Sequence, residues 1–147
     1  MKVGALERSP AVVCSSDAPV AQVARMMREH NVGSVVVVDD EVRVVGIVTD
    51  RDLVERVLAS DRDATTRTED VMTHDVVCAN EDDDVFTAAS QMATRACRRL
   101  PVVNADGLLQ GVVSLDDLVI AFARPMDQLA RAIGLEVLPR PALIGLT

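Results

Sequence analysis

Two short segments of the chain carry side chains whose types and spacing could bind a nucleotide. Thr49 precedes Asp52 by three residues, and Ser114 precedes Asp117 by the same interval. Each hydroxyl residue follows a glycine and two apolar residues, which predicts a buried strand that runs into a helix start. The unpaired N–H groups of a helix start attract phosphate, and a hydroxyl there can donate to the same oxygen. A carboxylate one turn further on can accept hydrogen bonds from both hydroxyl groups of a ribose.

The same spacing also describes a capping box, in which the two side chains close the helix start on itself. Its recurrence at two matching places favours the nucleotide site. The two interpretations are also compatible, because one residue can cap the helix in the free protein and contact a ligand in the bound protein.

The pattern recurs because most of the chain is a repeat. Residues 12–14 match residues 76–78, and residues 46–53 match residues 111–118. The matching text predicts an offset of 64 residues at the start and of 65 after a one-residue insertion near residues 82–84. Such self-similarity indicates one supersecondary unit used twice, in which each copy completes the core of the other. We therefore expect function between the copies.

Each copy is predicted to be a β-α-β-β-α unit. Strands are expected at 11–14, 34–38 and 42–48 in the first copy and at 76–78, 100–103 and 108–113 in the second, with second helices that begin at Thr49 and Ser114. The predicted fold class is α/β, with two such repeats packed by pseudo-two-fold symmetry. We expect the first repeat at residues 1–60, a linker at 61–67, the second repeat at 68–124, and a helix extension and tail at 125–147.

Composition narrows the function classes. The chain has 147 residues, an apolar share of 49%, a net charge of −8 and two aromatic residues, Phe86 and Phe122. The negative charge repels phosphate backbones, and the scarcity of aromatic residues argues against base stacking. Because no apolar run is long enough for a membrane span and the start lacks a signal-peptide pattern, we expect a cytoplasmic protein with no nucleic-acid or membrane partner.

The cysteines and histidines form no ligand set. Cys14, Cys78 and Cys97 have no CxxC spacing, which indicates free thiols. Cys14 and Cys78 match in the repeat, so they could meet as a metal or redox pair, although core packing is the commoner fate of such residues. With no catalytic triad, metal cluster or Walker-type loop in the sequence, we expect no enzyme activity, no catalytic residues and no metal.

The two copies together resemble a tandem pair of CBS domains (cystathionine β-synthase-type repeats), also called a Bateman module. The resemblance is carried by residues 32–39 and 46–53, by 98–103 and 111–118, and by the leading segment 69–73. It covers about residues 3–122. It implies a regulatory module that binds AMP, ADP, ATP or S-adenosylmethionine between its repeats, as a regulatory ligand and not as a cofactor. It also implies a homodimer.

The resemblance assigns roles to particular residues. In the first cleft, ribose would be held by Asp52 and phosphate would face Thr49, with help from Arg51. Adenine would be lined by Ser15, Ser16, Val20, Val32 and Gly33, and phosphate would be reached from the partner repeat by Arg98 and Arg99. The second cleft would use Asn80, Val85, Cys97, Ser114 and Asp117, with Gly33 and Ser34 opposite.

The two clefts are not expected to be equal. Asp116 stands where the first copy has Arg51, and a carboxylate there disfavours phosphate. We therefore expect nucleotide in the Asp52 cleft and a weak, empty or less charged Asp117 cleft. The alternative for Arg98 and Arg99 is a solvated strand edge.

The predicted function is ligand sensing, in which a bound nucleotide biases the placement of the repeats and an effector protein on another chain reads the change. The alternative is a non-catalytic dimeric interaction scaffold with vestigial nucleotide clefts. An apolar stripe on the final helix, which includes Val119, Leu129 and Ile133, predicts a core or dimer contact. The sequence does not name the ligand or the effector.

Overall fold

The computed structural model describes residues 1–6 and 10–137, in two similar units. The first unit contains β1 (Val13–Cys14), α1 (Val20–His30), β2 (Ser34–Val38), β3 (Val44–Thr49), α2 (Asp50–Leu53) and a π-helical turn, η2 (Val54–Leu58). The second contains β4 (Ala79–Asn80), α3 (Val85–Arg95), β5 (Arg99–Val103), β6 (Leu109–Ser114) and α4 (Leu115–Val137). Two short 3-10 turns, η1 (Val3–Ala5) and η3 (Thr68–Asp70), precede the units.

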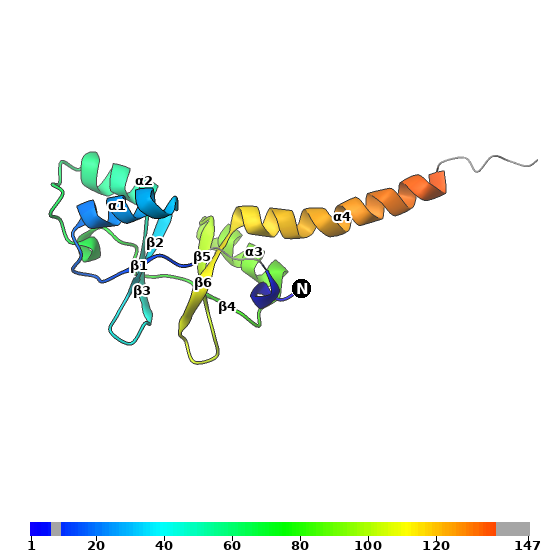
Figure 1. Ribbon diagram of the computed structural model, residues 1–147, viewed down its shortest axis with the longest axis horizontal. Coiled ribbons are helices and arrows are strands. Elements are labelled where there is room, and N and C mark those ends of the chain that lie inside the picture. Colours follow the sequence, from blue (N-terminus) through cyan, green and yellow to red (C-terminus); the bar gives the residue numbers. More distant parts are fainter. Residues whose placement is uncertain (7–9, 138–147) are drawn as a thin grey trace, which may run out of the picture.

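Each unit is built on one three-stranded sheet. The strand orders are β1-β2-β3 and β4-β5-β6, in which the first pair is parallel and the second pair antiparallel. Figure 1 shows the two units side by side, with the β2–β3 and β5–β6 hairpins pointing the same way. The hairpins also touch, because Arg43 donates to the backbone carbonyl of Asp106 at 3.2 Å. The predicted α/β fold with two similar repeats is confirmed.

The central strands are runs of β-branched residues because both of their faces are covered. Val35, Val36 and Val37 in β2 are fully buried. The helices α1 and α3 end in the same way, with Asn31 and Ala96 in the left-handed conformation that closes a helix C-terminus. These matched ends return the chain to the sheet at equivalent places in the two units.

The register of the strands corrects the predicted offset. Cys14 lies opposite Val37, and Ala79 lies opposite Val102. Val37 and Val102 are themselves equivalent, because they face the glycines of β3 and β6. Cys14 therefore corresponds to Ala79, the offset is 65 residues from the first strand onward, and no insertion is present.

The predicted strand at 76–78 and the predicted match of Cys14 with Cys78 are therefore wrong. Both expectations came from the identical Val-Val-Cys text, which is displaced by one residue from the structural register. Because side chains alternate between faces of a strand, a one-residue slip moves a residue from the core to the other face. Cys14 is buried, whereas Cys78 is only partly buried and the core position is taken by Ala79.

The two leading segments are exchanged between the units. In η1, Val3 N–H donates to the carbonyl of Asp83 at 2.8 Å, and the Val3 side chain is fully buried in the core of the second unit. In η3, Thr68 N–H and Oγ1 both donate to the carbonyl of Ala18, at 2.9 and 2.6 Å. Each copy thus completes the core of the other, as the repeat predicted. The predicted bounds of the repeats, residues 1–60 and 68–124 with a linker at 61–67, stay a prediction.

The helix α4 begins on the second unit and leaves it. Leu118 and Ala121 are buried against the sheet, whereas residues 123–133 are exposed. Figure 1 shows this part of α4 projecting away from the body. None of the described helices combines the length and the apolarity that crossing a membrane requires. The last part of the predicted tail, residues 138–147, lies outside the described residues.

Candidate functional site

Both hydroxyl–carboxylate pairs form capping boxes at their helix starts. Thr49 N–H donates to Asp52 Oδ2 at 2.9 Å, and Asp52 N–H donates to Thr49 Oγ1 at 3.2 Å. The Ser114 and Asp117 pair repeats this geometry at 2.7 and 3.1 Å. The capping interpretation is thus present in the structure in both copies. It also fixes each carboxylate at the point where a strand ends, ready to accept further hydrogen bonds.

The second carboxylate oxygen, Oδ1, has different surroundings in Asp52 and in Asp117. Asp52 Oδ1 lies 3.7 Å from Arg56 Nε, one helical turn on. For Asp117 Oδ1, the described part of the chain provides no hydrogen bond and no ion pair. Asp117 therefore keeps an acceptor available for a ligand, whereas Asp52 faces a cation of its own helix.

A cavity of about 290 Å³, which we call the Asp117 cleft, lies between the copies. It is lined by Pro10, Val12, Asn31, Val32, Gly33 and Ser34 of the first copy and by Arg99, Val112, Ser114, Asp116 and Asp117 of the second. Its volume is near the lower end of the range for small-molecule pockets, roughly 300–1,000 Å³. The cleft therefore joins a capping box with an apolar wall from the opposite copy.

Arg99 crosses this interface because Gly33 leaves room for it. A Cβ at position 33 would lie 2.6 Å from a guanidinium nitrogen of Arg99. Within residues 1–6 and 10–137, no hydrogen bond or ion pair occupies the Arg99 guanidinium. A planar group with five donors suits the oxygens of a phosphate or carboxylate. Arg99 thus supplies the cleft with an anion-binding group.

The other predicted cations are engaged elsewhere. Arg98 pairs with Asp116 at 3.6 Å, and Arg51 pairs with Glu55 at 2.8 Å, in both cases between exposed side chains. Exposed ion pairs of this kind contribute little to stability, so a ligand could recruit either arginine. Arg51 and Arg98 are therefore not free cations, as the prediction for the Asp52 cleft had them.

A second cavity of about 290 Å³ is related to the first by the repeat, and we call it the Cys97 cleft. Its lining is Ile47, Thr73, Asp75, Val76, Val77, Arg95, Cys97, Arg99 and Leu100. Ile47 takes the place that Val112 has in the Asp117 cleft, but neither Thr49 nor Asp52 is among the described lining residues. Arg95 and Asp75 form an ion pair at 2.9 Å within it.

The structure groups some predicted lining residues as expected and places others in the other cavity. Gly33 and Ser34, which were expected opposite Asp117, share a cavity with it, and so does Val32, which was expected beside Asp52. Cys97, expected beside Asp117, lies in the other cavity, with Ile47. The physical reason is the packing of the copies, which brings the start of β2 in one copy against the end of β6 in the other. The role of each residue toward a ligand stays a prediction.

Four other predicted residues lie outside both clefts. Val20 and Val85 are buried within the two cores, so their side chains face neither cavity. Ser15 donates its hydroxyl to Asp17 at 2.6 Å, and Asn80 N–H donates to Asp83 at 2.9 Å, both at the surface. The sequence did not indicate four residues that line the Asp117 cleft: Pro10, Val12, Asn31 and Val112. Val112 is the counterpart of Ile47 in the match of residues 46–53 with residues 111–118, and the two line equivalent cavities.

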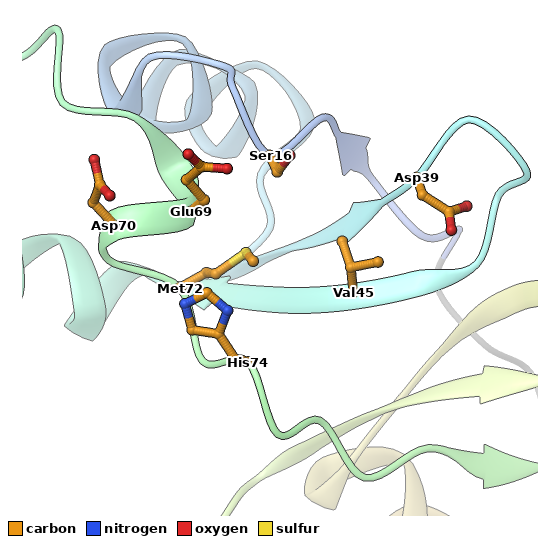
Figure 2. A pocket seen from close by; sticks show the side chains of 7 residues that line it. All are labelled: Ser16, Asp39, Val45, Glu69, Asp70, Met72 and His74. Carbon is orange, nitrogen blue, oxygen red and sulfur yellow. The ribbon is translucent and has the colours of Figure 1, made fainter.

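Ser16 lies in a third, open concavity of about 670 Å³ on the first unit. Its lining is Ser16, Asp39, Val45, Glu69, Asp70, Met72 and His74. Figure 2 shows Asp39 at the far end from Glu69 and Asp70, so the carboxylates do not converge on one point. Among the described side chains, no three His, Cys, Asp or Glu residues could hold a metal ion together. Three carboxylates also disfavour an anionic ligand there.

Burial makes Cys14 a poor nucleophile. Loss of hydration raises the pKa of the Cys14 thiol to about 11. The thiolate is the reactive form of cysteine, so at neutral pH Cys14 behaves as a small apolar core residue. Of the two fates considered for Cys14, the structure shows core packing.

Comparisons with known proteins match both copies of the repeat. The sequence model of the CBS domain matches residues 3–59 and 69–124. An uncharacterized 17.7 kDa protein of Acidianus ambivalens is 40% identical over 120 residues, which are 82% of this chain and 72% of that protein.

Two solved structures resemble the fold. The CBS domain pair of protein MJ0100, in complex with 5-methylthioadenosine and S-adenosyl-L-methionine, has a TM-score of 0.77 and 26% identity, over 85% of this chain and 98% of the other. The CBS domain protein PAE2072 of Pyrobaculum aerophilum, complexed with AMP, has a TM-score of 0.76 and 25% identity, over 84% and 99%.

Proposed function

The chain belongs to the CBS domain family, and we propose that it is a regulatory module that binds an adenosine-type ligand in the Asp117 cleft. The observation that carries the proposal is the convergence of Asp117, Ser114 and Arg99 in one cavity between the copies. In this arrangement Asp117 accepts from the ribose hydroxyls, and Arg99 holds the phosphate or carboxylate of the ligand. Support comes from the two similar structures, which hold AMP or S-adenosylmethionine with 5-methylthioadenosine.

The charge of the cleft favours a ligand with little negative charge. Among the described residues, Asp116 and Asp117 line the cavity together with a single guanidinium, that of Arg99. A second carboxylate opposes additional phosphate groups by like-charge repulsion. We therefore rank AMP or S-adenosylmethionine above ADP and ATP. The sequence favoured the Asp52 cleft, and we propose the Asp117 cleft instead because Thr49 and Asp52 line neither described cavity between the copies.

A thermal-shift panel with AMP, ADP, ATP and S-adenosylmethionine tests this proposal, because a ligand of the native state raises Tm. We expect AMP or S-adenosylmethionine to give the largest shift. Asp117→Asn removes the charge and keeps an oxygen that can accept from Ser114 N–H, so it should abolish the shift. Asp52→Asn is the matched control and should leave it unchanged.

The reverse pattern, with the shift lost only in Asp52→Asn, would place the ligand in the other copy. No shift with any ligand, in protein free of copurified nucleotide, would favour the alternative of an interaction scaffold with vestigial clefts.

The module is proposed to act as a homodimer in the cytoplasm and to signal to an effector protein, without catalysis. Several large apolar side chains on its helices are more than half exposed: Val54, Leu58, Phe86, Val119 and Ile120. A second copy would remove this surface from water. Ligand binding then changes the output only if the ligand prefers one placement of the repeats.

A further inference from the structure

The part of α4 beyond Pro125 carries an apolar face that the described chain leaves uncovered. Met126, Leu129 and Ile133 are each more than half exposed. A Cβ at Gly134 would meet nothing within 4 Å. Figure 1 shows this part of the helix standing clear of the body.

The apolar residues of α4 follow a heptad pattern. They recur at alternating intervals of four and three residues: Leu115, Val119, Phe122, Met126, Leu129 and Ile133. This spacing places them at the a and d positions of a coiled coil, in one seam along the helix. The seam begins on the body, where Phe122 stacks on Phe86 with ring centroids 5.0 Å apart, and continues onto the projecting part.

The residues beside the seam are small and those behind it are polar. In the projecting part, the flanking e and g positions hold Ala123, Pro125, Ala130 and Ala132, whereas on the body they hold Asp116 and Leu118. The opposite side holds Arg124, Asp127, Gln128 and Arg131, and Arg131 pairs with Asp127 at 2.9 Å. Small flanks allow two helices to approach closely and set no like charges against each other. The helix thus has one face suited to another helix and one suited to water.

The projecting part of α4, residues 126–137, is too short to form a stable helix by itself. Isolated helices shorter than about 12–15 residues are marginal in water. Pro125 weakens this one further, because it removes one backbone hydrogen bond inside α4. Cover for the seam would supply the missing stability.

We propose that the seam is covered by α4 of a second copy, in a parallel two-stranded coiled coil. The a positions hold Val119, Met126 and Ile133, of which two are β-branched, and the d positions hold Leu115, Phe122 and Leu129, of which two are leucine. β-Branched residues at a with Leu at d favour parallel dimers. A parallel pairing also buries the whole seam from Leu115 onward, whereas an antiparallel pairing of the projecting parts leaves Leu115 and Val119 uncovered.

A membrane surface is a poorer occupant of the seam. Residues 115–137 carry four acidic residues and two arginines. Helices that lie on anionic lipid are instead rich in basic residues on their polar face. The interface rests on the homodimer of the proposed function and is independent of ligand binding.

Cysteine cross-linking tests the parallel arrangement. In Ile133→Cys, the two copies of residue 133 would face each other across the seam, close enough for a disulfide. Mild oxidation should give a covalent dimer on a non-reducing gel. Gln128→Cys, on the outer side of the helix, is the matched control, and it and the unmodified chain should stay monomeric on the gel.

Sedimentation equilibrium separates this inference from the dimer itself. Leu129→Glu should raise the dimer dissociation constant at least tenfold, whereas Gln128→Glu, with the same added charge, should leave it unchanged. A stable dimer in which Ile133→Cys gives no cross-link would overturn the coiled coil and leave the homodimer intact. A monomer at all concentrations would overturn both. Flotation of the chain with phosphatidylcholine–phosphatidylglycerol vesicles, lost in Leu129→Glu, would also overturn the coiled coil.

Discussion

At the scale of residues, the proposed binding site depends on a contact between Gly33 and Arg99. Gly33 does not have a positive φ, so backbone conformation does not require a glycine there. A glycine is required because the Arg99 guanidinium occupies the space that a side chain at position 33 would need. A small residue in one copy thus positions a cation from the other.

Gly33→Ala should separate ligand binding from stability. The added methyl group meets the far end of a flexible side chain, so Arg99 can move aside and the free energy of unfolding should change by less than about 1 kcal/mol. Affinity for AMP should fall at least tenfold, because the displaced guanidinium no longer faces the cleft. Calorimetric titration and urea unfolding measure the two quantities.

Arg99→Gln provides the comparison for that variant. If it weakens AMP binding as much as Gly33→Ala does, the guanidinium is the cause. Unchanged affinity in both variants would contradict the role of Arg99.

The residue types of the candidate site could be predicted from the sequence, but their grouping could not. The hydroxyl–carboxylate spacing identified both capping boxes, and Asp117 lies in a cavity as expected. The packing of the two sheets decides which copy supplies the residues that face each carboxylate across its cavity. The local spacing of residues in the sequence contains no information on this packing. Val32 was therefore expected beside Asp52, whereas it lines a cavity together with Asp117.

At the scale of elements, the β2–β3 and β5–β6 hairpins differ in how well one turn residue suits the left-handed backbone conformation at its position. Val42 in the β2–β3 turn has φ of 62°, and its counterpart in the β5–β6 turn is Gly107, with φ of 79°. The left-handed region is costly for a β-branched residue and free of strain for glycine. The first copy thus carries a strain that the second avoids.

Val42→Gly should therefore stabilise the protein, by about 1 kcal/mol from the conformational cost of a left-handed residue. Val42 is exposed, so little apolar burial is lost. Thermal and urea unfolding measure the change. The reciprocal variant, Gly107→Val, should destabilise by a similar amount, and a loss of stability in Val42→Gly would refute the strain.

Strands were predicted correctly where the run of β-branched residues was long, and incorrectly where the strand was short. The valine run of β2 and the segment of β5 were located from their β-branched content. The outer strands β1 and β4 have two residues each, too few to show a period. Their register is set by pairing with β2 and β5, which is a tertiary property.

At the scale of the whole molecule, the exchange of leading segments makes the two repeats one cooperative body. Val3 belongs to the first copy in sequence and to the core of the second in space. Thr68 belongs to the second copy in sequence and packs on the first unit in space, where it donates hydrogen bonds to the carbonyl of Ala18. A change in either segment should therefore be felt in the other repeat.

Val3→Ala tests this coupling. Loss of a buried side chain of this size should cost about 2 kcal/mol. Urea unfolding should remain a single transition with a lower midpoint. Val13→Ala, at a more exposed strand position, is the control and should cost much less. Two separate transitions in Val3→Ala would show that the repeats unfold independently.

The most direct test of the proposed site is a crystal structure of the protein with AMP or S-adenosylmethionine. We expect one ligand between the copies, with its ribose hydroxyls within hydrogen-bond distance of Asp117 and its anionic group against Arg99. A ligand whose ribose lies on Asp52, with the Asp117 cleft unchanged, would show that the proposed site is wrong.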